Sequence, residues 1–312
     1  MDILEKNLML SVIIPVYMSE KILKHTVDQT LNTLNSIGIK YEILLIDDGS
    51  IDNTWQVAKS CAKNFENVKA IKLIKNYGQH TAIYCGISHA KGKYIVTMDD
   101  DLQNPPEEII KLLTKAEEGY DLVFANFEEK KHANYRKFGT RIINLLNKKI
   151  FNKSDEIKLT NFRIFTKDVA DRLLLYRVYE PYIQGLLLMH ATKIANITTK
   201  HEARRVGKSN YSLSKIITLV CRLLFNYSSY PLKFLSISGG IIALVSFIWG
   251  FVIILKQLFI GSQVEGWTTL VTLLAFLNGF IILLLGVLGE YLIRLIKTVS
   301  RNEPYHVEEL VT

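Results

Sequence analysis

Three consecutive carboxylates, Asp99, Asp100 and Asp101, follow directly on the short apolar run YIVTM. Gln103 and a pair of prolines come next, in the stretch DDDLQNPPEEI. Adjacent negative charges at the end of a strand repel one another unless a cation lies between them. Oxygen-rich clusters are what Mg²⁺ or Mn²⁺ prefer, especially beside a phosphate group. The sequence therefore predicts a divalent-cation site here.

Two further apolar runs also end in polar residues. The run YEILLI leads into Asp47-Asp48-Gly49-Ser50, and LSVIIPVY ends at Tyr17, with Glu20 shortly after. Each stretch alone is also typical of a turn or a helix cap, because Asp, Asn, Gly and Pro favour turns. Their recurrence after successive buried strands favours a ligand site over simple turns.

The elements that must position these residues alternate between strand-like and helix-like patterns over about the first 210 residues. This alternation with short loops predicts an α/β fold with a mostly parallel, doubly wound sheet. In such sheets ligands bind beyond the carboxyl ends of the strands. The expected strands are 10–17, 41–50, 68–74 and 94–98, and the expected helices are 22–38, 52–65, 78–92 and one beginning near 104.

Several function classes lack their motifs. No GxGxxG follows the first strand and no GxxxxGK[ST] is present, which disfavours a dinucleotide oxidoreductase or a P-loop NTPase, and HExxH and GxSxG are also missing. Lys and Arg exceed Asp and Glu by 38 − 30 = 8, a balance that suits an anionic membrane surface or a phosphorylated substrate. The short lysine pairs are typical of solvated surface, so no nucleic-acid partner is expected. The three cysteines are scattered, as free thiols in a reducing compartment would be.

Two uncharged apolar segments of 22 residues each, Phe234 to Leu255 and Thr268 to Gly289, lie near the C-terminus. As helices each would extend ~33 Å, about one bilayer core, so they predict two transmembrane helices; the alternative is a pair of buried core helices. Basic residues crowd both outer flanks, which predicts a multi-pass protein of the plasma or inner membrane with its catalytic domain and both termini in the cytoplasm. Ser212 to Pro231 favours an interfacial helix over a surface helix of a soluble domain.

At this point the sequence resembles family 2 glycosyltransferases. The resemblance rests on IPVY, DDGSIDNT and the block NYGQHTAIYCGISHAKGKYIVTMDDDLQNPPEEI. The DxDLQxPPE form, NFRIF, RRVGKSNYS and the two C-terminal apolar segments are similar to the polyprenyl-phosphate glycosyltransferases, such as dolichyl-phosphate mannose synthase and bacterial enzymes that load a sugar onto undecaprenyl phosphate. It extends over nearly the whole chain, and its motifs are specific in combination.

The resemblance implies a nucleotide-diphosphosugar transferase (GT-A, Rossmann-like) fold and an inverting, Mg²⁺- or Mn²⁺-dependent transfer from a nucleotide-sugar, with UDP favoured, to a polyprenyl phosphate. It implies four regions: a catalytic domain, 1–211; an interfacial region, 212–232; a transmembrane hairpin, 233–296; and a cytoplasmic tail, 297–312. Asp100, at the variable middle position, is expected to point away from the site. The implied site residues are Pro15, Tyr17, Glu20, Asp48 and Asp99 for the nucleotide-sugar, Asp101 and Gln103 for the metal and, with Asp99, for catalysis, and Arg136, Arg141, Arg163, Arg204 and Ser209 for acceptor or phosphate.

Three positions depart from the family pattern. Met18 and Ser19 stand where Asn-Glu usually follows IPVY, and Thr160-Asn161 replaces the usual Gly-Asp before FR. Asn210 follows Ser209, where many members have Lys or Arg. These changes bear on donor identity and acceptor contacts more than on the reaction type.

Three alternatives stay open on the sequence. A processive polysaccharide synthase would carry QxxRW, and no Arg-Trp pair occurs in this chain. A transferase acting on a different lipid or on a protein would share most of the motifs. A non-catalytic membrane scaffold that keeps the fold is a third, against which the intact Asp99, Asp101 and Gln103 argue. The sequence leaves homo-oligomerisation undecided.

Overall fold

The computed structural model describes residues 9–127, 134–176, 180–200, 202, 213–260, 266–299 and 304–312. The chain divides into two compact units. The first unit contains residues 1–216 and 303–312, and the second contains residues 217–302.

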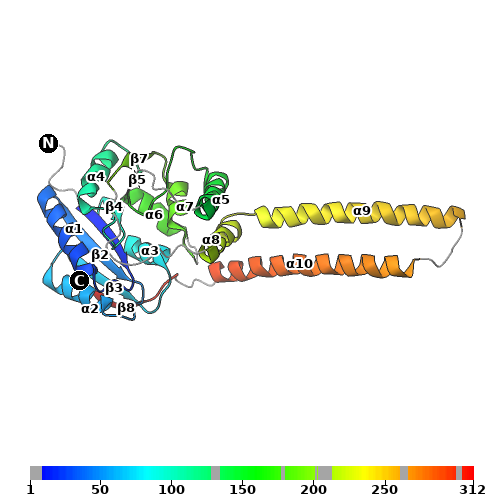
Figure 1. The fold of residues 1–312 in the computed structure, drawn as a ribbon, viewed down its shortest axis with the longest axis horizontal. Coiled ribbons are helices and arrows are strands. Elements are labelled where there is room, and N and C mark those ends of the chain that lie inside the picture. The colour runs from blue at the N-terminus through cyan, green and yellow to red at the C-terminus, as the bar shows by residue number, and fades with distance from the viewer. Residues whose placement is uncertain are drawn as a thin grey trace. The chain divides into compact units, whose positions relative to one another are not determined.

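Within its described residues, the first unit is built on one eight-stranded sheet with strand order β7-β5-β6-β4-β1-β2-β3-β8 (Figure 1). The central strands β4, β1, β2 and β3 are parallel, whereas β6 and β8 run antiparallel to their neighbours. The sheet is therefore mixed rather than wholly parallel. The strands are β1 (Met9–Val16), β2 (Lys40–Asp47), β3 (Val68–Leu73), β4 (Tyr94–Thr97), β5 (Leu122–Asn126), β6 (Arg163–Thr166), β7 (Ile194–Thr198) and β8 (Val307–Val311).

Helices cover both faces of this sheet, which is why β1 and β2 are buried along almost their whole length. Val12 and Ile14 of β1 belong to the core that α1, α2 and α4 complete on one face. On the other face α3 comes so close that a Cβ at Gly86 would lie 3.2 Å from the Cδ1 of Ile13. The helices of this unit are α1 (Leu23–Ile37), α2 (Thr54–Asn64), α3 (Gln79–His89), α4 (Ile109–Glu117), α5 (Asn134–Phe151), α6 (Lys167–Leu175) and α7 (Ile183–His190), with a short 3-10 turn η1 (Pro106–Glu108).

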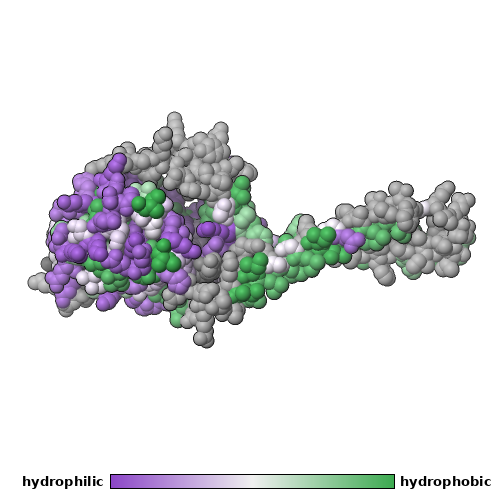
Figure 2. Space-filling view, turned by 90° about the horizontal axis from the view of Figure 1, so that it is seen from below, coloured by the Kyte–Doolittle hydropathy of each residue, from purple (hydrophilic) through white to green (hydrophobic). Residues whose placement is uncertain are grey.

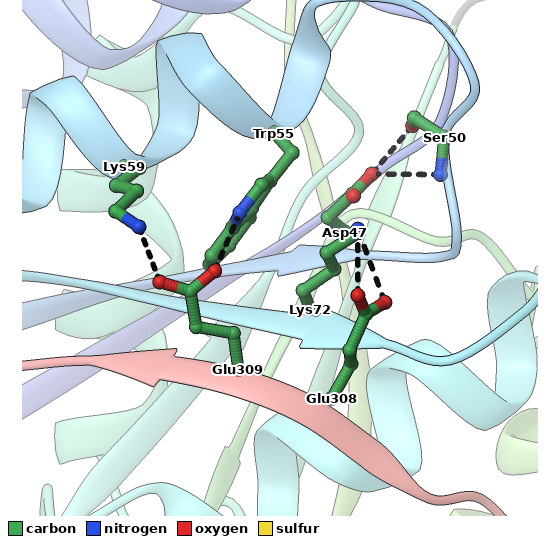
Figure 3. Close-up of polar contacts among 7 residues, drawn as sticks. All are labelled: Asp47, Ser50, Trp55, Lys59, Lys72, Glu308 and Glu309. Carbon is green, nitrogen blue, oxygen red and sulfur yellow. Dashed lines mark hydrogen bonds and ion pairs between the residues drawn. The ribbon is translucent and has the colours of Figure 1, made fainter.

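The last strand, β8, returns to the edge of the sheet beside β3 (Figure 3). Glu309 accepts a hydrogen bond of 3.0 Å from the Nε1 of Trp55 and pairs with Lys59, both on α2. Glu308 forms an ion pair of 3.0 Å with Lys72 of β3. The sequence prediction placed residues 297–312 in a separate tail. The segment that forms β8 is too short for its sequence pattern to predict a strand, because that prediction needs knowledge of the sheet edge it joins.

The second unit contains most of α8 (Leu213–Asn226) together with α9 (Tyr230–Ile260) and α10 (Trp267–Val299). The hydroxyl of Tyr291 donates a 3.1 Å hydrogen bond to the carbonyl of Ser228, and a Cβ at Gly239 would lie 3.4 Å from the ring of Phe280. The described atoms of α9 and α10 are largely hydrophobic on the face seen in Figure 2.

Many large apolar side chains of α9 and α10 are exposed, among them Phe234 at 72% and Ile282 at 69%. Among the residues that the structure describes, no helix is both long and apolar enough to cross a membrane. The two transmembrane helices thus stay a prediction from the sequence.

Candidate active site

Three acid-bearing loops meet at one edge of the first unit because the strands that precede them are adjacent and parallel. Val16 of β1 lies opposite Asp47 of β2, and Ile13 lies opposite Thr97 of β4. The chain leaves the sheet in hydrogen-bonded steps: the amide of Asp48 donates to the carbonyl of Val16, and the amide of Met98 donates to the carbonyl of Ile13. The acidic stretches predicted to lie together therefore share this edge.

The Asp47–Ser50 loop is held by its own backbone and by the loop after β3. Asp48 is buried, and its two carboxylate oxygens accept the amides of Tyr77 at 2.7 Å and Gly78 at 2.8 Å. Burial nevertheless raises the pKa of Asp48 to about 6. Asp47 accepts both the hydroxyl, at 2.5 Å, and the amide, at 3.3 Å, of Ser50 (Figure 3).

Gly49 makes this loop geometry attainable. Its φ is +68°, and a Cβ there would lie 2.7 Å from the backbone nitrogen of Asn76. The position thus requires a residue without a side chain for two separate reasons, conformation and space.

The acidic triplet after β4 is held by side chains instead. Gln79 Nε2 donates to Asp99 Oδ1 at 2.5 Å, and the hydroxyl of Ser19 donates to Asp100. Burial raises the pKa of both Asp99 and Asp100 to about 6, and the charge of Asp101 adds to the effect in each. Asp100 turns toward Ser19 at the start of the α1 region.

Asp101 is buried and accepts the amide of Gln103 at 3.1 Å. Leu102 between them has a φ of +54°, a conformation that is uncommon for a residue with a side chain and found preferentially at functional sites. The amide of Glu202 donates to the carbonyl of Gln103 at 2.9 Å, so the segment that leads into residues 203–212 begins beside this loop.

The residues predicted to hold a divalent cation fit that group. The neighbouring negative charges that help to raise the pKa of Asp99 and Asp100 would be neutralised by a bound cation. Asp101 and Gln103 would supply two oxygen ligands, which leaves positions for water and a ligand phosphate. No group of three or more His, Cys, Asp or Glu side chains arranged to hold a metal by itself occurs among the described residues.

Arg163 differs from its predicted role. It lies on β6 opposite Thr97 and is fully buried, so no phosphate reaches its side chain in this structure. Nη1 donates to the carbonyl of Thr160 at 3.2 Å, while Nε and Nη2 have no hydrogen-bond partner. Burial lowers its pKa to about 10, an effect that the nearby charge of Asp99 opposes. Arg163 is thus a buried positive charge behind the acidic triplet; the sequence could not show that β6 runs back beside β4.

The other residues predicted for the nucleotide-sugar border the same edge. Pro15 lies near the end of β1, opposite Ile46. Tyr17 follows with 47% of its surface exposed. Glu20 accepts the amide of Asn53 at 3.2 Å, which ties it to the start of α2.

Of the residues predicted for the acceptor, Arg141 is exposed on α5. Arg136 lies on the same helix, and its side chain is outside the described part of the structure. Arg204 and Ser209 fall outside the described residues.

Three hydrogen-bonded amide side chains were missed from the sequence: Gln79 and Asn161, which bond to Asp99, and Gln184, which bonds to Asn161. Asn161 Nδ2 donates to Gln79 Oε1 at 3.4 Å, and Gln184 Nε2 donates to Asn161 Oδ1 at 3.3 Å. Asn161 was noted only as a missing carboxylate. The three come from different elements, so no sequence spacing joins them.

This fold is shared with solved sugar-transferring synthases. Glucosyl-3-phosphoglycerate synthase from Mycobacterium tuberculosis, in complex with Mn²⁺, UDP and phosphoglyceric acid, aligns with a TM-score of 0.52 and 16% identity over 70% of this chain and 77% of that one. Mannosyl-3-phosphoglycerate synthase from Rubrobacter xylanophilus aligns with a TM-score of 0.50 and 16% identity over 70% and 72%. These likenesses define the fold class, an α/β domain of the GT-A type.

The sequence places the chain within that class. The model of the family described as "Glycosyl transferase family 2" matches residues 11–174, so this protein belongs to glycosyl transferase family 2. It is 34% identical to the undecaprenyl-phosphate 4-deoxy-4-formamido-L-arabinose transferase of Edwardsiella ictaluri, over 96% of this chain and 94% of that protein. The protein of the same name from Proteus mirabilis is 33% identical over 100% of this chain and 96% of that one.

Proposed function

We propose that this protein transfers a sugar from a nucleotide-sugar, with UDP as the favoured nucleotide, to the phosphate of a polyprenyl lipid such as undecaprenyl phosphate. The main support is the near full-length similarity to transferases named for undecaprenyl phosphate, which includes the C-terminal segments beyond the catalytic domain. The three acidic loops at one edge of the sheet supply the matching chemistry.

The donor is proposed to lie across the strand ends. Asp48, fixed by two backbone amides, would hold the base together with Pro15, Tyr17 and Glu20. Asp99 would lie near the ribose and the diphosphate. Asp101 and Gln103 would hold Mg²⁺ or Mn²⁺, which when bound neutralises the negative charge of the departing nucleoside diphosphate.

The acceptor phosphate is proposed to act directly as the nucleophile. A phosphate monoester is already an anion near neutral pH, so no general base is needed. One of its oxygens forms a bond to the anomeric carbon as the bond from that carbon to the diphosphate oxygen breaks, which inverts the configuration. Arg136 and Arg141 of α5, with Arg204 and Ser209, would bind and align the phosphate, since guanidinium groups bind phosphate bidentately.

The lipid acceptor requires a site at a membrane surface. The exposed apolar side chains of α9 and α10 are what a lipid environment would cover, since exposed apolar surface of this extent marks an interaction surface. The basic flanks of both helices favour a cytoplasmic catalytic domain. We propose on this basis that the protein lies in the inner or plasma membrane.

A direct transfer assay tests the proposal. The full-length protein in detergent is incubated with Mn²⁺, undecaprenyl phosphate and a panel of nucleotide-sugars that includes UDP-4-deoxy-4-formamido-L-arabinose. We expect a glycosyl undecaprenyl phosphate, detected by mass spectrometry. In a parallel reaction with extracted membrane lipids, transfer to other lipids but not to undecaprenyl phosphate would contradict the proposed acceptor. No transfer from any donor in either reaction would contradict the proposed activity.

A further inference from the structure

A chain of side-chain hydrogen bonds leads away from Asp99 across the first unit. Gln79 Nε2 donates to Asp99 at 2.5 Å, and Asn161 Nδ2 donates to Gln79 Oε1 at 3.4 Å. Asn161 also hydrogen-bonds Asp99 directly, so the two amides reach Asp99 together. Gln184 Nε2 in turn donates to Asn161 Oδ1 at 3.3 Å. Each amide uses its nitrogen toward Asp99 and its oxygen away from it.

The chain continues to α5. The hydroxyl of Tyr182 donates to Gln184 Oε1 at 2.8 Å, and Asn147 Nδ2 donates to the hydroxyl of Tyr182 at 3.2 Å. Asn147 Nδ2 also donates to the carbonyl of Ile143 at 3.0 Å. Because a carbonyl only accepts, this last contact fixes the orientation of the Asn147 amide. Tyr182 must therefore accept from Asn147 and donate onward.

The direction of all five bonds is thus the same, from α5 toward Asp99. Hydrogen bonds aligned head to tail polarise one another, so the loss of one member weakens the others. Asn147 and Tyr182 are buried, whereas Gln79 is exposed and Asn161 is half-buried. The chain therefore runs from the interior between α5 and α7 out to the surface where the donor is proposed to lie.

The end of the hydrogen-bond chain at Asn147 lies on the same helix as part of the proposed acceptor site. Arg141 is six residues before Asn147 on α5, about 9 Å along the helix axis. A change in the position of α5 when a phosphate binds its arginines would displace Asn147, and with it the hydrogen bonds that orient Asp99.

We propose that the chain Asn147–Tyr182–Gln184–Asn161–Gln79 couples occupation of α5 by the acceptor phosphate to the orientation of Asp99 at the donor site. This inference rests on the proposed function. These residues are positioning residues, because none needs to contact the reacting atoms. The two substrates then bind with positive cooperativity: each raises the affinity for the other by the same factor.

Tyr182→Phe tests the coupling with the smallest change. It removes one hydroxyl from the middle of the chain and keeps the ring, which packs against the rings of His80 and Phe151. The matched control is Tyr84→Phe, which removes a buried tyrosine hydroxyl bonded to the carbonyl of Leu174, outside the chain.

The measurement is the dissociation constant of UDP with Mn²⁺, determined by calorimetry on the full-length protein in detergent, with and without undecaprenyl phosphate. Turnover is not needed. We expect the lipid phosphate to tighten UDP binding of the wild type and of Tyr84→Phe by roughly five- to tenfold, within the usual range of such couplings, and that of Tyr182→Phe by less than about twofold.

A second variant, Gln184→Met, should reduce the coupling to the same extent, and the double variant should lose no more than either single one, because both interrupt one chain. Wild type that binds UDP equally well with and without the lipid phosphate would overturn the coupling, while observed transfer would leave the proposed function intact. Coupling in the wild type that Tyr182→Phe and Gln184→Met both retain would overturn the hydrogen-bond chain while leaving the proposed function intact.

Discussion

The Asp47–Ser50 loop and the Asp99–Gln103 loop occupy the same edge of the sheet and hold their charges differently. Both carboxylate oxygens of Asp48 accept backbone amides, whose positions the neighbouring loop fixes. Asp99 and Asp100 accept from the side chains of Gln79 and Ser19, which can rotate. The carboxylate of the first loop is thus oriented by backbone groups, whereas Asp99 and Asp100 of the second loop are oriented by side chains.

Both loops bury carboxylates that have too few positively charged partners. Burial raises the pKa of Asp48, Asp99 and Asp100 to about 6 in each case. Backbone hydrogen bonds alone do not cancel the desolvation of Asp48. The acidic triplet has the additional repulsion of three adjacent charges, which a bound cation would remove.

The largest expected effect falls on the Asp99–Gln103 loop. Asp101→Ala removes one of the two proposed metal ligands, and we expect sugar transfer to fall by about 100-fold or more, since metal stabilisation of a leaving group contributes several kcal/mol. The initial rate of transfer from a radiolabelled donor measures this. The control is Asp155→Ala, the same change at an exposed acid that pairs with Lys148, which should keep wild-type activity. A variant at residue 101 with wild-type rates would remove the metal from the mechanism.

The Asp47–Ser50 loop predicts a stability effect at Gly49. Gly49→Ala must accommodate both a positive φ and a Cβ that meets the backbone of Lys75 and Asn76, so we expect a loss of about 3 kcal/mol in the free energy of unfolding. Gly38→Ala is the matched control, because its φ is also positive, +72°, but nothing lies within 4 Å of the added Cβ; about 1 kcal/mol is expected there. Chemical denaturation in detergent gives both free energies of unfolding. Equal losses would show that residue 49 does not pack closely against the backbone of Lys75 and Asn76.

Asp48 predicts a pH dependence of the ligand-free protein. Its pKa is about 6 in the folded state, against 3.8 for an aspartate in the unfolded chain, so the folded state binds more protons between these values. Stability therefore falls as pH rises from about 4 to 6. Asp48→Asn should flatten part of this slope, although the new NH2 group would face the amide of Tyr77 or Gly78 and lower the stability at every pH. If Asp48 holds the base as proposed, the KM for the donor should rise by about tenfold. Thermal melts at pH 4.5 and 7 test the first effect; a slope identical to wild type would contradict it.

The smallest effect is expected at the sheet edge. Glu309→Gln weakens the contacts that β8 makes with Trp55 and Lys59 of α2, but the carboxylate is partly exposed and water replaces much of the interaction. We expect a slight fall in melting temperature with unchanged KM for the donor. Glu66→Gln, an exposed acid in the loop before β3, serves as control and should leave the melting temperature unaltered.

Much of the first unit could be predicted from local pattern. The buried runs at β1, β2 and β4 and the helical periodicity of α1 depend on neighbours in sequence, and so does the expectation that Asp48 and Asp101 lie at strand ends. Pairing between segments far apart in the sequence determines the direction of β6, the position of β8 and the burial of Arg163. Periodicity in the sequence does not predict such pairing. The amides Gln79, Asn161 and Gln184 are joined only through space.

The most direct test of the account is a comparison of UDP binding with and without Mn²⁺, by calorimetry, in the wild type and in Asp101→Ala. If the loop after β4 anchors the donor through a divalent cation, Mn²⁺ should tighten UDP binding of the wild type by about tenfold or more and should have little effect on the variant. Tight, Mn²⁺-independent binding of UDP by the wild type, or an equal gain from Mn²⁺ in both proteins, would contradict that claim.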